Sequence, residues 1–232
     1  MPATPLLLIP GLACTDTLFA AQIPPLSQDR QVIIGDHMQH DSMADIAAYV
    51  LANAPDRFAL AGLSMGGYLC FEIMRQASER VERLALLDTS ARADTPEKTA
   101  LRHEALELAA AGKFMTVCYA TLDLSIAKSR HDDTTLKQAI IDMALDTGPD
   151  VWAQQIHAII GRVNSAPMLG NITCPTLVVV GEEDQLTPPE LAREMAAGIP
   201  DAQLEVIKDC GHMSTMEKPD RLTGLLQDWL AT

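Results

Sequence analysis

Basic residues are scarce in this chain. Its 232 residues include 17 Lys and Arg against 31 Asp and Glu, so the formal net charge is −14. Nucleic acids and anionic membrane surfaces attract cationic proteins. The charge balance therefore predicts no nucleic-acid partner and no membrane partner, and the excess of acidic residues is interpreted as serving solubility.

Long apolar runs are absent as well. No stretch approaches the roughly 20 apolar residues that a membrane-spanning helix needs. The opening MPATPLLLIPGL has no basic segment, and its short run LLLI stops at a Pro-Gly turn. We interpret this stretch as a strand rather than a signal peptide, so the expected location is the cytoplasm.

Cysteine pairs with metal-site spacing are also missing. The five cysteines are odd in number and show no C-x-x-C pattern, which predicts reduced thiols rather than a disulfide framework or a zinc site. The polar cluster at 36–41, DHMQHD, leads into a predicted helix and lacks a clear ligand geometry. We interpret it as a solvated loop, and we predict neither a metal nor an organic cofactor.

Short apolar runs alternate with helical patterns along much of the chain. Apolar residues make up 48% and charged residues 21%, which is typical of a soluble globular protein, and the length suits one substantial core. Strand–helix alternation predicts an α/β fold, a mainly parallel sheet with helices on both faces. The runs predicted as strands are Leu6–Ile9, Val32–Ile34, Phe58–Ala61, Leu84–Leu87, Thr176–Val180 and Gln203–Ile207.

The alternation breaks between residues 92 and 170. This stretch has no convincing strand and shows helical patterns near 96–111, 113–122, 132–146 and 150–161. We therefore predict that 1–91 and 171–232 form the core, and that 92–170 is a helical cap inserted over the carboxyl edge of the sheet.

The stretch FALAGLSMGGYL carries the strongest chemical signal. Residues 62–66 match G-x-S-x-G between a strand pattern and a helix pattern, as a nucleophile elbow requires. In so tight a turn, side chains at 62 and 66 would collide, so glycine is needed at both positions. Free N–H groups at the start of the following helix can stabilise an oxyanion. Ser64 is the candidate nucleophile.

A serine hydroxyl needs a base and a residue that orients the base. Asp184 follows the strand run TLVVV, and His212 follows the run QLEVI. Because the carboxyl ends of parallel strands meet at one edge, we expect both side chains near Ser64. The chain order Ser, Asp, His is the one that this elbow motif predicts.

The identity of the acid stays open at this point. Glu182 and Glu183 adjoin Asp184, and Asp88 ends the strand run LALLD. The Thr-Pro-Pro turn that follows Asp184 favours that residue over Asp88. His212 is one of six histidines, and its place after the last strand favours it over the others.

Four stretches resemble the successive signatures of the α/β-hydrolase superfamily: LLLIPGLACT, GLSMGG, VVGEEDQLTPP and DCGHMSTMEKP. They span nearly the whole chain. The resemblance implies a capped serine hydrolase whose oxyanion hole consists of the backbone N–H groups of Leu12 and Met65. Pro10-Gly11 stands where many members carry His-Gly, which bears on the geometry of the loop.

Two further expectations concern surfaces. The family's two leading strands are absent, so Val32–Ile34 is expected at an exposed edge, where a homodimer contact would form. Arg162, near the end of the cap, could clamp a substrate carboxylate. The alternative, weighed somewhat higher, is an ion pair that holds the cap to the body.

The resemblance implies hydrolysis of a small carboxylic ester, or a related small-molecule acyl compound, through an acyl-enzyme on Ser64. Cleavage of C–C bonds in ring-fission diketones and opening of enol-lactones are alternatives within the same fold. Met213 follows His212 where C–C cleaving members often carry Trp, which disfavours that option. A ligand receptor that retains the three residues is the alternative from another class.

Overall fold

The computed structural model describes residues 3–231, and its centre is a six-stranded sheet in which every neighbouring pair is parallel. The strand order is β2-β1-β3-β4-β5-β6. All six predicted runs are strands; the first two have the predicted bounds, and each of the last four is longer than predicted. The strands are β1 (Leu6–Ile9), β2 (Val32–Ile34), β3 (Phe58–Leu63), β4 (Val81–Leu87), β5 (Thr176–Gly181) and β6 (Ala202–Ile207).

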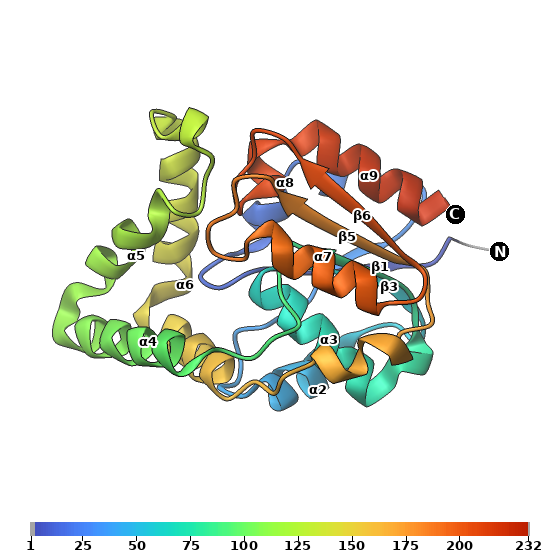
Figure 1. Ribbon diagram of the computed structural model, residues 1–232, viewed down its shortest axis with the longest axis horizontal. Coiled ribbons are helices and arrows are strands. Elements are labelled where there is room, and N and C mark those ends of the chain that lie inside the picture. Colours follow the sequence, from blue (N-terminus) through green and yellow to red (C-terminus); the bar gives the residue numbers. More distant parts are fainter. Residues whose placement is uncertain (1–2, 232) are drawn as a thin grey trace.

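Helices cover both faces of the sheet (Figure 1). Successive side chains of a strand point to opposite faces, so Leu7 and Ile9 join one buried cluster while Leu6 and Leu8 join the other. The first cluster includes α2 (Met43–Asn53), α3 (Met65–Ala77) and α7 (Pro189–Gly198). The second includes η1 (Asp16–Phe19), α1 (Ile23–Leu26) and α9 (Pro219–Ala231), and α8 (Ser214–Glu217) contacts η1 and α9. A short helix, η2 (Ser78–Arg80), connects α3 to β4.

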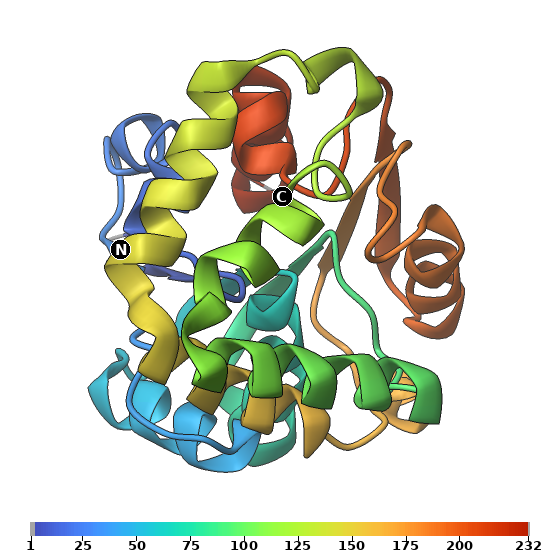
Figure 2. The same ribbon diagram turned by 90° about the vertical axis from the view of Figure 1, so that its left-hand side faces the viewer.

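The segment between β4 and β5 is helical and lies at the carboxyl ends of the strands (Figures 1 and 2). A small apolar cluster holds its helices together through Phe114, Ala144, Trp152 and Ile156. The two helices predicted at 132–146 and 150–161 form one element with a break at Gly148, where φ is 75°. The elements are α4 (Pro96–Leu108), η3 (Ala109–Lys113), α5 (Phe114–Leu122), η4 (Lys128–Arg130), α6 (Thr134–Ile160) and η5 (Ala166–Asn171).

The strand β2 forms one edge of the sheet, as predicted, because among the described strands it pairs with β1 alone. A homodimer contact at this edge stays a prediction. Within residues 3–231, no helix combines the length and the apolar character that crossing a bilayer requires.

Candidate active site

Ser64 occupies the turn between β3 and α3 in a backbone conformation that side-chain-bearing residues rarely adopt. Its φ is 56° and its ψ is −115°. Such a conformation costs about 1–3 kcal/mol and persists only where the surroundings enforce it. Here the N–H of Ser64 donates to Leu87 O at 2.9 Å, and its carbonyl accepts from Thr89 Oγ1 at 2.7 Å. Leu87 is the last residue of β4 and Thr89 follows it closely, so the neighbouring strand holds the turn in place.

Two glycines make this turn sterically feasible. A Cβ atom at Gly62 would clash with the carbonyl of Gly66, and a Cβ atom at Gly66 would clash with the carbonyl of Ile9. The collision predicted from the G-x-S-x-G pattern is therefore present in the backbone. A Cβ atom at the next residue, Gly67, would clash with the side chain of Thr89, so α3 can lie this close to the segment after β4 only with glycine at that position.

Two backbone N–H groups near Ser64 have no hydrogen-bond partner among residues 3–231. Met65 is the first residue of α3, so its N–H has no acceptor within the helix. The N–H of Leu12 makes no hydrogen bond within the described part of the chain, and Leu12 lies on the loop after β1. These are the two groups that the family resemblance implies as the oxyanion hole.

The loop that carries Leu12 is held on both sides by buried side chains. His37 Nε2 lies 3.0 Å from Gly11 O, and the N–H of Ala13 donates to Gln155 Oε1 at 2.9 Å. Both side chains are almost fully buried. Gln155 belongs to α6, so the cap directly braces this loop.

The interpretation of residues 36–41 as a solvated loop is wrong for His37. Its ring is 1% exposed and hydrogen-bonded to the backbone of Gly11. Burial lowers the pKa of His37, against the opposing effect of the Gly11 hydrogen bond, so the ring is neutral at pH 7. Within residues 3–231, no group of three or more His, Cys, Asp or Glu side chains is arranged to hold a metal ion.

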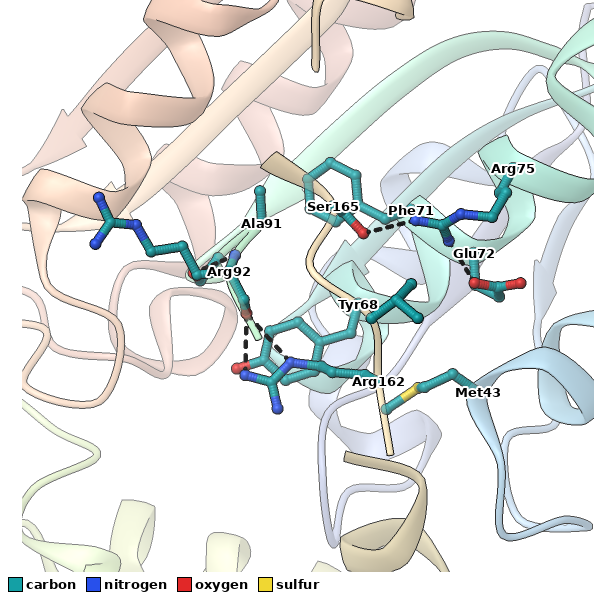
Figure 3. Close-up of a pocket in the computed structure, with 11 residues that line it drawn as sticks. Met43, Tyr68, Phe71, Glu72, Arg75, Ala91, Arg92, Arg162 and Ser165 are labelled. Carbon is teal, nitrogen blue, oxygen red and sulfur yellow. Dashed lines mark hydrogen bonds and ion pairs between the residues drawn. The ribbon is translucent and has the colours of Figure 1, made fainter. Parts of the chain in front are cut away.

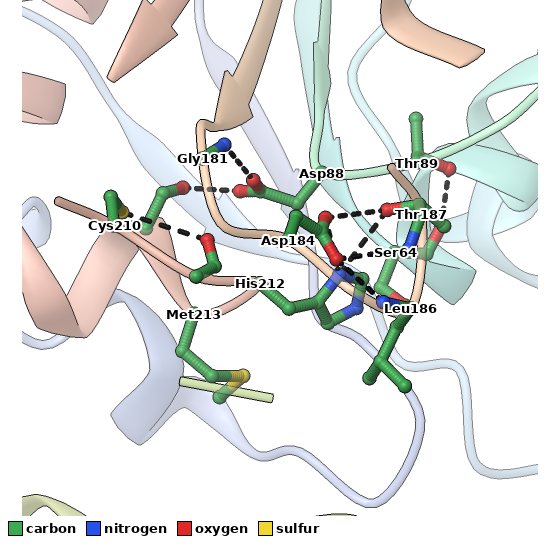
Figure 4. Close-up of polar contacts among 12 residues, drawn as sticks. Ser64, Asp88, Thr89, Gly181, Asp184, Leu186, Thr187, Cys210, His212 and Met213 are labelled. Carbon is green, nitrogen blue, oxygen red and sulfur yellow. Dashed lines mark hydrogen bonds and ion pairs between the residues drawn. The ribbon is translucent and has the colours of Figure 1, made fainter. Parts of the chain in front are cut away.

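Asp184 and His212 form a hydrogen-bonded pair at the ends of two neighbouring strands (Figure 4). His212 Nδ1 lies 2.8 Å from Asp184 Oδ2, which also accepts from Thr187 Oγ1 at 2.7 Å. Asp184 Oδ1 accepts the N–H groups of Leu186 and Thr187, both at 2.9 Å. A carboxylate only accepts, so Nδ1 of the ring carries the proton and Nε2 is free to take another.

The electrostatics of this pair favour charge separation. Burial alone would raise the pKa of Asp184, but the charge and hydrogen bond of His212 and the bonds from Thr187 hold it below its ordinary value. For His212, burial opposes the charged form, yet Asp184 outweighs burial and the pKa of the ring is raised. The pair is thus built to stabilise an imidazolium.

Asp88, the alternative acid, does not hydrogen-bond to His212. Its carboxylate accepts the N–H of Gly181 at 2.9 Å and contacts the hydroxyl of Ser214. Burial, reinforced by the nearby charge of Asp184, raises the pKa of Asp88 to about 8. At neutral pH this carboxyl is therefore mostly protonated, which suits a structural role better than the orientation of a base.

The two neighbouring glutamates also point elsewhere. Glu182 is exposed, and Glu183 accepts the N–H of Lys128 at 3.1 Å. Among the alternatives considered from the sequence, Asp184 is the carboxylate that the structure places against the His212 ring.

Ser64 and His212 line the same cavity, and the described hydrogen bonds do not include one between the Ser64 hydroxyl and the ring. Such bonds are often long in free enzymes and tighten when substrate binds. The backbone around His212 is fixed by the cap, because the N–H groups of His212 and Met213 both donate to Ser125 O, at 3.0 and 3.2 Å.

Glu217 is a buried carboxylate that the sequence analysis did not identify. Its Oε1 accepts the N–H groups of Gly211 and Met213, at 2.9 and 3.2 Å, which flank His212 on both sides. Its Oε2 accepts the N–H of Ala127, in the cap, at 2.8 Å. One side chain thus ties the histidine loop to the cap. The only sequence signal is an acidic residue five positions after the histidine.

The cavity that these residues border has a volume of about 410 Å³, which suits a small molecule. The cap supplies most of its wall, and most of that wall is aliphatic or aromatic. Its apolar lining side chains include Leu12, Leu101, Val117, Leu122, Ile140, Ile141, Trp152, Ile156, Ile159, Leu186 and Met213.

Arg162, the predicted substrate contact, is not among the residues that line this cavity. It lines a separate and much smaller pocket, beside Tyr68 and Arg92 (Figure 3). Its guanidinium donates to Asp94 Oδ1 at 2.8 Å and to the carbonyls of Arg92 and Ile159. It also stacks 4.2 Å from the centre of the Tyr68 ring. The side chain is 7% exposed, so the ion pair weighed as the alternative is the contact that the structure shows.

Comparison with known proteins places these features in a family. The family model described as alpha/beta hydrolase fold matches residues 4–219. A thermophilic esterase from Thermogutta terrifontis, in a malate-bound structure, superposes with a TM-score of 0.90 at 30% identity, covering 99% of this chain and 90% of the esterase. The enol-lactonase from Burkholderia xenovorans LB400 gives 0.90 at 24% identity, covering 99% and 92%. A protein of Mycobacterium tuberculosis H37Rv named as a non-heme bromoperoxidase is 29% identical over 199 residues, 82% of this chain and 74% of the relative.

Proposed function

The chain belongs to the alpha/beta hydrolase fold family, and on that premise we propose that it is a serine hydrolase that cleaves a small carboxylic ester through an acyl-enzyme on Ser64. The observation that carries the proposal is the 2.8 Å bond between His212 Nδ1 and Asp184 Oδ2 on the same cavity wall as a strained Ser64.

The first half of the reaction acylates the enzyme. Ser64 Oγ attacks the ester carbonyl while His212 Nε2 takes the hydroxyl proton. Asp184 keeps the ring in the required tautomer and stabilises the imidazolium. The N–H groups of Leu12 and Met65 donate to the oxyanion, and each donor contributes about 3 kcal/mol at the barrier. His212 then gives its proton to the departing alcohol oxygen.

The second half releases the acid. A water molecule takes the place of the alcohol, and His212 removes its proton as it attacks the acyl carbon. The tetrahedral intermediate collapses, the proton returns to Ser64 Oγ, and the carboxylic acid leaves. The apolar wall that the cap supplies limits bulk water around these charges, which strengthens each hydrogen bond.

A fluorophosphonate probe with peptide mapping tests the nucleophile. We expect the label on Ser64 and its loss in Ser64→Ala, with turnover of a short-to-long acyl ester panel falling by about 10⁴-fold or more. Ser27→Ala, which removes an exposed hydroxyl directly after α1, is the matched control and should behave like the wild type. A label on another residue, or full activity in Ser64→Ala, would exclude this mechanism.

The panel also separates the alternatives that share the fold. Enol-lactones are internal esters and pass through the same acyl-enzyme, whereas ring-fission diketones break a C–C bond. If enol-lactones are hydrolysed faster than open-chain esters, the natural substrate is a lactone. If ring-fission diketones are cleaved faster than open-chain esters, the scissile bond is a C–C bond. A receptor is distinguished by tight binding with a single slow cycle of cleavage.

A further inference from the structure

The charge of the cavity wall is opposite to that of the protein. The chain carries 31 acidic and 17 basic residues, yet the lining includes Lys98 and Arg102 and, within the described residues, no Asp or Glu. The remaining wall is mostly apolar, so little else competes with these two cations for an anionic group. A cavity of this kind favours an anion over a neutral molecule of the same shape.

Both cations come from one face of α4. They are four residues apart, so their side chains project from the same side of the helix, together with the lining residues Leu101 and Ala105. In Figure 2, α4 crosses the cap in front of the core. Lys98 is exposed, and within residues 3–231 its ammonium group makes no ion pair or hydrogen bond.

Arg102 is partly buried and held in place by Asp94. Its Nε donates to Asp94 Oδ2 at 2.5 Å, and its side chain is 23% exposed. Asp94 is 2% exposed and also binds Arg162, whose guanidinium is otherwise bonded to backbone carbonyls. One carboxylate therefore serves two guanidinium groups, and the three side chains keep a net charge of +1.

The free end of Arg102 is the part available to a ligand. In the described part of the chain its two terminal nitrogens have no hydrogen-bond partner, whereas Nε is already bonded to Asp94. The planar NH1–NH2 edge of a guanidinium matches the two oxygens of a carboxylate. The Asp94 bond fixes the direction of the fork before any ligand arrives.

We propose that Arg102, assisted by Lys98, binds a carboxylate of the substrate, so that the preferred ester carries a negatively charged acid group away from its scissile carbonyl. This inference rests on the proposed function for the identity of the scissile bond. Arg102 forms a bidentate pair with the acid, Lys98 adds a more distant and more exposed charge, and the apolar wall holds the chain between acid and ester.

A matched pair of substrates tests this inference. Mono-4-nitrophenyl adipate carries the free acid, and its methyl ester is the neutral analogue. We expect the wild type to prefer the anionic ester by about tenfold in kcat/KM, with the difference mainly in KM, and the preference to weaken as salt is raised. Arg102→Gln should bring the ratio close to one, Lys98→Gln should lower it less, and Arg102→Lys should give an intermediate ratio.

The control variant is Arg221→Gln, which removes a cation that pairs with Glu205 outside the cavity wall. It should keep the wild-type ratio. Equal ratios in the wild type and Arg102→Gln, or a preference for the neutral ester, would overturn the carboxylate site while leaving turnover through Ser64 intact.

A binding measurement separates this inference from the proposed function. The probe is monomethyl adipate, titrated into Ser64→Ala and into the same variant carrying Arg102→Gln. Binding that weakens about tenfold without Arg102 supports the site even if no ester is turned over, in which case the proposed function alone fails. Equal affinity in the two variants excludes the site.

Discussion

Replacing Asp184 by Asn tests which carboxylate orients His212. The amide oxygen can keep the N–H groups of Leu186 and Thr187, which Asp184 Oδ1 now accepts at 2.9 Å. The amide nitrogen then faces His212 Nδ1, where Oδ2 now lies at 2.8 Å. A donor at that point favours the tautomer with the proton on Nε2, and this ring cannot accept the proton of Ser64.

The expected loss follows from that tautomer. We expect kcat for an activated ester to fall by about 10⁴-fold, equivalent to about 5 kcal/mol at the barrier, with little change in KM. Asp184 also raises the pKa of His212 above the ordinary value of about 6.5. In the wild type, kcat/KM should therefore fall as the pH drops through a value above 6.5, and in Asp184→Asn the residual activity should persist to lower pH.

Asp88→Asn is the matched control, since it makes the same change in the neighbouring buried carboxyl. The amide oxygen can accept the N–H of Gly181. The Ser214 hydroxyl, which donates to Asp88 Oδ2 in the structure, can rotate to accept from the amide nitrogen. We expect kcat/KM within about threefold of the wild type, less than 1 kcal/mol at the barrier.

The assay is the initial rate of ester hydrolysis between pH 5 and 9 for the wild type and the two variants. Circular dichroism melting curves show whether each variant is folded. A large loss in Asp88→Asn with near-normal activity in Asp184→Asn would refute the reasoning, because the other carboxylate would then orient the ring.

Three smaller changes test the contacts around the site. Glu217→Gln places an amide nitrogen opposite the N–H of Ala127, so calorimetry should show the protein less stable by about 1–3 kcal/mol, with kcat lowered as well. Gln155→Leu leaves the N–H of Ala13 unpaired but also removes a buried amide nitrogen without a partner. Stability should then change little while kcat falls about tenfold, and an unchanged kcat would show that the loop needs no brace. Asp88 has a raised pKa when folded, so its contribution to stability is present below its unfolded value near 4 and is lost as the pH rises toward 8. Urea titrations at pH 5 and pH 8 measure this effect. The free energy of unfolding should decrease less between these two pH values in Asp88→Asn than in the wild type.

Much of the site could be predicted because its signals are local. Gly62 and Gly66 are required by atoms within four residues of each other and by the adjacent β1, so the pattern G-x-S-x-G identifies the turn. The four inner strands stand out as apolar runs because inner strands of a parallel sheet are buried on both faces. The edge strands β2 and β6 are only partly buried. Because Ser64, Asp184 and His212 each follow a strand, all three are predicted at the carboxyl edge of the sheet.

Other residues could not be assigned because their roles depend on partners far along the chain. The His37 ring hydrogen-bonds to the carbonyl of Gly11, 26 residues earlier, and the Gln155 side chain accepts the N–H of Ala13, 142 residues earlier. Glu217 accepts an N–H from 90 residues away. Arg162 was noticed as a lone cation of the cap, but its neutralising partner Asp94 became visible only through packing.

The sequence by itself determined the succession of strands and helices along the chain and the strained turn at Ser64. Both depend on apolar periodicity and steric exclusion, which act between residues close in the chain. The tertiary structure decided that Asp184 rather than Asp88 meets His212, and that Arg102 rather than Arg162 borders the cavity. Side-chain pairing of this kind depends on how loops from separate strands and the cap pack together, and no short stretch of sequence encodes that packing.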